Sequence, residues 1–130
     1  MKILVIDDDS GMRYTLTRVL TSGGHEVVTA EDGDRGMEAF RRLAPELVIT
    51  DIFMPEQEGI ETIRQIRRER PATKIMAISG SISGDRFDVL EIARLLGADD
   101  ALQKPFDAAE LLNRVQQLQT TPRRNEGLAA

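Results

Sequence analysis

The chain has 130 residues and contains no cysteine and no tryptophan. The missing thiols exclude disulfides and thiolate metal sites, and they fit a reducing compartment. No apolar run approaches the length of a membrane span, and no basic and apolar leader stands at the N-terminus. Basic residues are in the minority, because 17 Lys and Arg face 22 Asp and Glu, for a formal net charge of −5. This balance disfavours nucleic-acid binding through a broad basic surface.

What the sequence does contain predicts an α/β domain, for which the length is sufficient. Five short apolar runs alternate with five segments of helical periodicity. We expect strands at residues 2–7, 25–30, 46–50, 74–79 and 101–103, and helices at about 10–22, 33–43, 57–69, 85–96 and 108–118. Ser10 is expected to cap the first helix and Asp107 the last. Strict alternation with short connections predicts a parallel sheet covered by helices on both faces. The domain should span residues 1–119, followed by a flexible tail at 120–130.

The stretch Leu-Val-Ile-Thr-Asp-Ile-Phe-Met-Pro at residues 47–55 is central to the functional argument. Its first four residues are apolar or β-branched without polar alternation, which is typical of a strand buried on both faces. Asp51 stands where this strand should end, and Pro55 prevents a regular continuation. The carboxyl ends of parallel strands form the ligand crevice of open α/β sheets. Asp51 is therefore either a reactive group or an ordinary turn or cap residue, and this stretch by itself leaves both possibilities open.

Other polar residues should gather at the same edge of the sheet, and they favour the reactive interpretation. They are Asp7, Asp8, Asp9, Asp51, Ser79 and Lys104. Singly, each fits a cap, a turn or a solvated side chain. Together, carboxylates in one crevice repel unless they share a cation, and a hard ion such as Mg²⁺ suits their oxygen ligands. A serine hydroxyl and a lysine can bind phosphoryl oxygens, so the set contains the groups that in-line phosphoryl transfer requires.

From Lys2 to about Leu118 the chain resembles a response-regulator receiver domain, the phosphoacceptor module of two-component signalling. The matching segments are Ile-Leu-Val-Ile-Asp-Asp-Asp at 3–9, Thr-Asp-Ile-Phe-Met-Pro-Glu-Gln-Glu-Gly at 50–59, Ser79-Gly80 and Lys104-Pro105-Phe106. The resemblance implies a flavodoxin-like (βα)5 fold, a three-layer sandwich around a five-stranded parallel sheet in the order 2-1-3-4-5.

The resemblance also implies a role for each residue of the site. Asp51 would be phosphorylated, Ser79 would be the switch hydroxyl, and Lys104 would be the lysine typical of the family. Mg²⁺ or Mn²⁺ would be held by Asp8, Asp51, Asp7 and the backbone carbonyl of Phe53. A cis peptide is implied at Lys104-Pro105. The donor would be a histidine kinase or a histidine phosphotransfer protein in the cytoplasm. The chain would be no enzyme beyond its own phosphorylation and dephosphorylation.

Signalling should follow from the same resemblance. Change on activation is expected between Ser79 and Phe87, which includes Gly80 and Ser81, and it would bias the face made by residues 85–96, 101–103 and 108–118. Ala101 stands where the family usually carries an aromatic residue, so aromatic coupling is excluded. Phe53 and Ser81 occupy positions that tune loss of the phosphoryl group, and they favour a slow to moderate lifetime. The residues expected to dock the histidine donor are Gly11, Tyr14, Thr15 and Arg18. The downstream partner is expected to be an unknown protein, and no direct nucleic-acid or membrane partner is expected. Since no output domain is expected within these residues, the chain should either signal by binding this partner or come from a longer protein.

A haloacid-dehalogenase-like phosphohydrolase is the alternative. Asp7 would then be the nucleophile and Asp9 the acid/base, with Ser79, Lys104 and the pair Asp99-Asp100 completing the set. This interpretation gives Asp51 no role and leaves little room for an inserted cap. A flavodoxin-like nucleotide binder would fit the fold, but the first strand is not followed by a glycine-rich phosphate loop.

Overall fold

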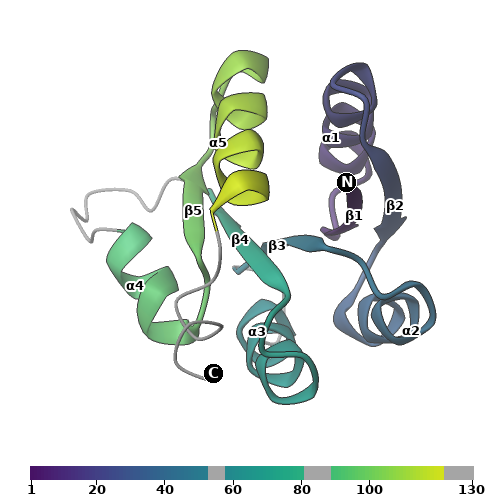
Figure 1. Cartoon of the computed structure of the whole chain (residues 1–130), viewed down its shortest axis with the longest axis vertical. Helices are drawn as coiled ribbons and strands as arrows, with labels where there is room; N and C mark the ends of the chain where they lie inside the picture. The colour runs from purple at the N-terminus through teal and green to yellow at the C-terminus, as the bar shows by residue number, and fades with distance from the viewer. Residues whose placement is uncertain (53–57, 81–88, 122–130) are drawn as a thin grey trace.

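The computed structural model describes residues 1–52, 58–80 and 89–121, in which strands and helices alternate (Figure 1). The elements are β1 (Lys2–Ile6), α1 (Ser10–Ser22), β2 (Glu26–Ala30), α2 (Gly33–Leu43), β3 (Leu47–Asp51), α3 (Glu58–Glu69), β4 (Lys74–Ser79), α4 (Val89–Leu96), β5 (Asp100–Gln103) and α5 (Ala108–Thr120). The predicted alternation is confirmed, with small shifts at the ends of elements.

The five strands form one parallel sheet in the order β2-β1-β3-β4-β5, as the resemblance implied. Asp51 at the end of β3 pairs in register with Ile78, and Ser79 at the end of β4 pairs with Gln103. Because every strand runs in the same direction, their carboxyl ends meet at one edge of the sheet. This topology brings residues from distant parts of the chain to one place.

Helices cover both faces of the sheet. Figure 1 shows α1 and α5 on one side, and α2, α3 and α4 on the other. On the first side, Leu16 and Leu20 of α1 share a buried cluster with Leu111 and Val115 of α5. On the second side, α2 and α3 contribute buried side chains to a separate cluster, among them Met37, Phe40, Ile63 and Ile66. Burial of a large apolar side chain contributes about 1.5–3 kcal/mol, so these two clusters fix the helices on the sheet.

The structure corrects the predicted cap of the first helix. Ser10 is the first helical residue, whereas Asp9 is the cap, since its Oδ1 accepts hydrogen bonds from the backbone N–H of Gly11 at 2.9 Å and of Met12 at 3.4 Å. Serine and aspartate both cap helices well. The cap is the residue with extended backbone just before the first helical residue, and here that residue is Asp9. The other predicted cap is confirmed, because Asp107 Oδ1 accepts from the N–H of Glu110 at 2.8 Å.

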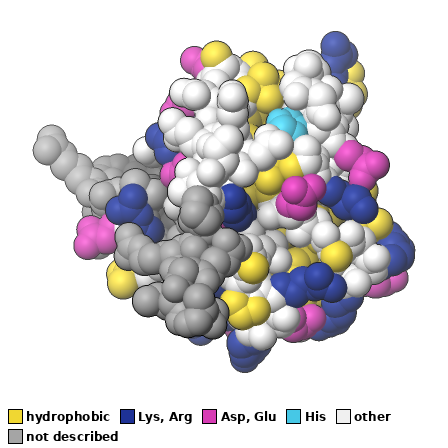
Figure 2. All heavy atoms as spheres, in the orientation of Figure 1, with side chains coloured by type: hydrophobic (Ala, Val, Ile, Leu, Met, Phe, Trp, Pro, Cys, Tyr) yellow, Lys and Arg dark blue, Asp and Glu magenta, His cyan; other side chains and the backbone are white. Residues whose placement is uncertain are grey.

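The surface agrees with the mixed composition. On the face shown in Figure 2, acidic and basic side chains are interspersed, and neither sign forms a broad field there. None of the helices in the described part of the chain is long and apolar enough to cross a membrane. Several sequence predictions fall on residues 53–57, 81–88 and 122–130, which lie outside the described residues. They concern Phe53, Ser81, most of the segment from Ser79 to Phe87 in which change is expected, and most of the tail.

Candidate functional site

Three carboxylates converge at the carboxyl edge of the sheet. Asp7 and Asp8 follow β1, and Asp51 ends β3, its neighbour in the sheet. One carboxylate oxygen from each lies within 4.8 Å of the other two. Asp7 is 1% and Asp51 7% exposed, whereas Asp8 is open to solvent. An oxygen-rich set with one open side is the arrangement that a hard divalent cation with bound waters requires.

Lys104 brings a positive charge to this cluster from the end of β5, the edge strand two places from β3. It follows β5, and its Nζ lies 2.8 Å from Asp51 Oδ2 and 3.3 Å from Asp7 Oδ2. Its backbone N–H donates to the carbonyl of Ser79 at 2.7 Å, which fixes the turn after β5 against the end of β4. The Lys104-Pro105 peptide is cis, as expected. Three carboxylates thus face one ammonium, which leaves excess negative charge for a further cation to balance.

Burial and charge act on the pKa values of this cluster in opposite directions. Removal from water raises the pKa of Asp7, and its hydrogen bond with the Asp9 backbone and the charge of Lys104 offset only part of the increase. Burial also opposes the charge of Lys104, but the hydrogen bond and charge of Asp51, together with the charge of Asp7, hold the Lys104 pKa above its ordinary value. Lys104 is therefore ammonium at neutral pH, while the ionised form of Asp7 is disfavoured.

Ser79 completes the predicted group with an unusual feature. Its side chain is fully buried at the end of β4, and its Oγ has no hydrogen-bond partner among the described residues. A buried hydroxyl without a partner costs about 1–3 kcal/mol. A ligand atom that accepts a hydrogen bond at this edge would remove that cost, and a phosphoryl oxygen is such an acceptor.

Gly59 allows α3 to begin directly against the site. A Cβ at this position would come within 2.7 Å of Ile52 Cα and would also collide with the backbone oxygen of Asp51. Backbone atoms cannot move aside as a flexible side chain can, so only glycine fits without distortion. Glycine at position 59 thereby allows α3 to lie against the backbone that carries Asp51.

The remaining predicted residues separate into two groups. Ala101 is buried in β5, and Gly80 follows Ser79 with open space around its Cα. Gly11, Tyr14, Thr15 and Arg18 are all exposed on α1, which begins directly after the acidic turn. Arg18 Nη1 donates to the Tyr14 hydroxyl at 3.1 Å, and its guanidinium lies 5.8 Å from the ring centroid. This surface is accessible to a partner, and its role in docking stays a prediction.

The structure does not assemble the phosphohydrolase set. Asp9 is engaged as the helix cap, and Asp99 and Asp100 lie at the start of β5, away from its carboxyl end. Asp99 pairs with Arg67 at 2.6 Å and accepts from the N–H of Ile75, while Asp100 pairs with Arg114 at 2.8 Å. These acidic residues hold elements together at the opposite edge of the sheet. Asp51, which that interpretation leaves without a role, is at the centre of the site.

Sequence reasoning missed Arg13. Its Nη1 donates to the backbone carbonyl of Asp7 at 2.7 Å, so α1 reaches back to the turn that carries two of the carboxylates. The one sequence signal for this contact is that Arg13 lies about one helical turn after Asp9. A solvated arginine often has the same spacing from an acidic residue, so the signal is weak.

Comparison with known proteins agrees with this geometry. The family model described as "Response regulator receiver domain" matches residues 3–116. A probable transcriptional regulator, ycf27 of Porphyridium aerugineum, is 39% identical over 88% of this chain and 46% of its own length. Response regulator MprA of Mycobacterium leprae is 36% identical over 91% of this chain and 50% of its own length. The chain thus spans about half of these relatives.

Solved structures show the same fold. The receiver domain of NtrX from Brucella abortus has a TM-score of 0.82 and 31% identity, over 92% of this chain and 99% of that one. A response regulator receiver domain from Clostridium thermocellum has a TM-score of 0.80 and 32% identity, over 90% and 92% of the two chains. With the sheet order, the acidic cluster and the family match in agreement, this chain belongs to the response regulator receiver domain family.

Proposed function

We propose that the chain is a phosphoacceptor switch, in which Asp51 receives a phosphoryl group from a phosphohistidine on a histidine kinase or histidine phosphotransfer protein. The observation that carries the proposal is the placement of the Asp51 carboxylate. It ends a fully buried strand, lies 2.8 Å from Lys104 Nζ, and shares its surroundings with Asp7 and Asp8. A carboxylate held in this way is an oriented nucleophile with a cation beside it.

In the proposed reaction, one carboxylate oxygen of Asp51 attacks phosphorus as the phosphorus–nitrogen bond of the donor breaks. The electron pair of that bond returns to the imidazole, and the product is an acyl phosphate on Asp51. Lys104 is placed to offset negative charge on the equatorial oxygens, because its ammonium already contacts Asp51 and its raised pKa keeps it charged. Hydrolysis of the acyl phosphate returns the chain to its starting state, and no separate substrate is turned over.

Mg²⁺ or Mn²⁺ is the proposed cofactor, and the donor set fits it. Asp8 and Asp51 would be direct ligands, Asp7 a ligand directly or through water, and the backbone carbonyl of Phe53 a further ligand. When bound, the ion neutralises carboxylate and phosphoryl oxygens as a Lewis acid. The chain's own contribution is to hold the three carboxylates within reach of one another before any ion binds, at the cost of mutual repulsion and a raised Asp7 pKa.

Signalling would start at Ser79. Its hydroxyl, which has no hydrogen-bond partner among the described residues, is one strand away from Asp51, so a phosphoryl group on Asp51 would offer it an acceptor. The backbone bond from Lys104 to the Ser79 carbonyl connects this movement to the end of β5. We propose that the surface of α4, β5 and α5 responds through Ser79 and Gly80, without an aromatic switch, because Ala101 has none.

The partners follow from the family and from the charge of the surface. A cytoplasmic histidine donor docks on α1 through Gly11, Tyr14, Thr15 and Arg18, and an unknown protein binds the output surface. Direct nucleic-acid binding by this domain is disfavoured by its net charge of −5. Phe53 and Ser81 carry no acid or amide to orient an attacking water, which supports a slow to moderate phosphoryl lifetime.

The test is labelling with a small phosphodonor and saturating Mg²⁺, followed by intact-mass measurement. We expect a base-labile gain of one phosphoryl group that Asp51→Asn abolishes and Asp7→Asn retains. Asp7→Asn is the matched control, because it removes a neighbouring carboxylate and high Mg²⁺ compensates for weaker metal binding. The opposite dependence, or steady release of phosphate from phosphomonoesters, would support the phosphohydrolase instead.

A further inference from the structure

Asp8 presents a structural problem, because no contact between its side chain and another described residue fixes its position. It is exposed, and no hydrogen bond or ion pair of its carboxylate joins it to another described residue. Yet one of its oxygens lies within 4.8 Å of oxygens of Asp7 and Asp51. Within the described part of the chain, only the backbone determines where this solvated carboxylate lies. The orientation of the peptide between Asp7 and Asp8 therefore decides where this proposed metal ligand points.

Asp7 is held at each of its polar groups. Its N–H donates to the carbonyl of Ala30 at 3.1 Å, and its Oδ1 accepts from the N–H of Asp9 at 2.9 Å. Its Oδ2 lies 3.3 Å from Lys104 Nζ. The remaining group is the carbonyl oxygen, which belongs to the Asp7-Asp8 peptide, and Arg13 Nη1 donates to it at 2.7 Å. A short bond from a charged donor is about twice as strong as a neutral one.

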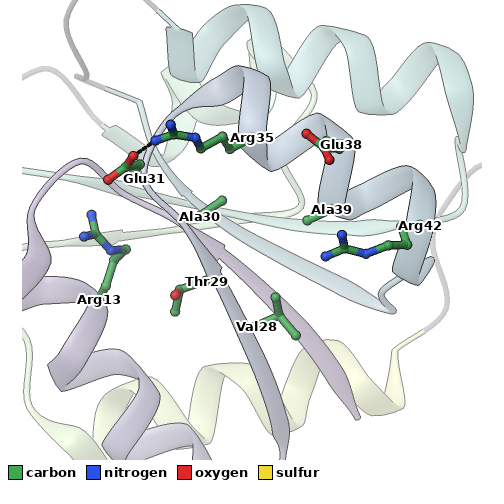
Figure 3. A pocket seen from close by; sticks show the side chains of 9 residues that line it. All are labelled: Arg13, Val28, Thr29, Ala30, Glu31, Arg35, Glu38, Ala39 and Arg42. Carbon is green, nitrogen blue, oxygen red and sulfur yellow. Dashed lines mark ion pairs between the residues drawn. The ribbon is translucent and has the colours of Figure 1, made fainter.

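The surroundings of Arg13 favour this single role. Arg13 lies at one end of a hollow of about 590 Å³ between α1, β2 and α2, near the Arg35–Glu31 ion pair, while Arg42 lies at the other end (Figure 3). The pair next to it already balances its own charges. Arg13 makes no ion pair with a carboxylate in the described part of the chain, and the residue is half-buried. Among the residues that the structure describes, the Asp7 carbonyl is the one hydrogen-bond partner of the Arg13 side chain.

We propose that Arg13 is a positioning residue for the divalent-cation site: by holding the Asp7 carbonyl it sets the peptide that aims the Asp8 carboxylate. This inference rests on the proposed function, because it assumes that the carboxylates bind a cation. Groups that orient metal ligands typically change metal affinity by about 10- to 100-fold when they are removed. The charge of Arg13 by itself lowers Mg²⁺ affinity, since a nearby cation repels the ion. Salt screens this repulsion, whereas it does not change the orientation of a peptide, so the two effects differ in their salt dependence.

The test compares Arg13→Met, Arg13→Lys and the control Arg42→Met, which removes an equal charge from the far end of the same hollow. Mg²⁺ affinity is measured by titration calorimetry at low and at high salt. We expect Arg13→Met to weaken binding about tenfold at both salt concentrations, with partial recovery in Arg13→Lys, whose ammonium can donate to the same carbonyl. Arg42→Met should bind as the unchanged protein does.

A second readout needs no metal. Backbone amide resonances of Asp8 and Asp9 in the metal-free protein should shift in Arg13→Met and stay in place in Arg42→Met, with both variants folded by circular dichroism. Unchanged or stronger Mg²⁺ binding in Arg13→Met, with unmoved amides, would overturn the role of Arg13 and leave the proposed function intact. Failure of the unchanged protein to bind Mg²⁺ would overturn both.

Discussion

Replacement of Ser79 by alanine should make the unphosphorylated domain more stable. The Ser79 hydroxyl is fully buried and has no partner among the described residues, which costs about 1–3 kcal/mol. Removal of the hydroxyl leaves a space smaller than a methyl group, and a cavity of methyl size costs about 1 kcal/mol. We therefore expect the free energy of unfolding to rise by about 1 kcal/mol, or the melting temperature by about 4 °C.

Urea unfolding followed by far-ultraviolet circular dichroism measures this change, because the chain has no tryptophan. The midpoint should move to higher urea with an unchanged slope. Thr50→Val is the matched control on the neighbouring strand. Its hydroxyl is also fully buried, but it donates to the carbonyl of Asp51 at 3.3 Å. Loss of a bonded hydroxyl should lower stability by about 1 kcal/mol, the opposite sign.

The same pair of variants tests the switch. A phosphoryl analogue bound with Mg²⁺ should stabilise the unchanged protein and Thr50→Val more than Ser79→Ala, since only Ser79 is expected to donate to it. If Ser79→Ala instead lost as much stability as Thr50→Val before any analogue is added, the hydroxyl would be satisfied in the resting protein. The argument for Ser79 as a waiting donor would then be wrong.

Three further predictions test other parts of the account. Burial raises the Asp7 pKa, so the folded state binds this proton more tightly than the unfolded state and loses stability as pH rises through the raised pKa. Metal-free Asp7→Asn should therefore be more stable than the unchanged protein at neutral pH, and the gain should fade below about pH 4 in urea titrations at several pH values. A gain that grew in acid would contradict this. Gly59→Ala should lower the free energy of unfolding by about 2 kcal/mol, because the added Cβ would collide with backbone atoms. Gly80→Ala is the control and should change it little, since a Cβ there has no described atom within 4 Å. Equal melting temperatures of the two variants would refute the close approach at Gly59. Asp99→Ala should lower the free energy of unfolding by about 3 kcal/mol, since it leaves the partly buried Arg67 and the N–H of Ile75 without this acceptor. Glu69→Ala, which removes the exposed partner of Arg41, should change it far less, because solvent screens that pair. Similar losses in the two variants by chemical denaturation would show that burial does not separate the two pairs.

The fold and the central residues could be predicted because they depend on local patterns. Short apolar runs that alternate with helical periods define a parallel sheet, and a parallel sheet collects its strand ends at one edge. Asp7, Asp51, Ser79 and Lys104 each follow such a run, so their convergence follows from chain order. The structure confirms this convergence for Asp7, Asp51 and Lys104, because the Lys104 ammonium contacts both carboxylates.

What the sequence could not provide depends on contacts between distant residues. The Arg67–Asp99 pair joins positions 32 residues apart, and neither residue differs in local pattern from a solvated charge. The sequence predicts Ser10 as the cap of α1, whereas the structure has Asp9, because adjacent residues that both cap well give no local distinction. The lone hydroxyl of Ser79 and the bond from Arg13 depend on packing, which no periodicity records.

The central claim is that Asp51 is the residue that carries the phosphoryl group. Borohydride reduction of the phosphodonor-treated protein converts an acyl phosphate to an alcohol, which peptide mass spectrometry locates along the chain. We predict homoserine at position 51, dependent on both the phosphodonor and Mg²⁺, and unreduced aspartate at positions 7, 8 and 9. Homoserine at position 7, with Asp51 unchanged, would contradict the account.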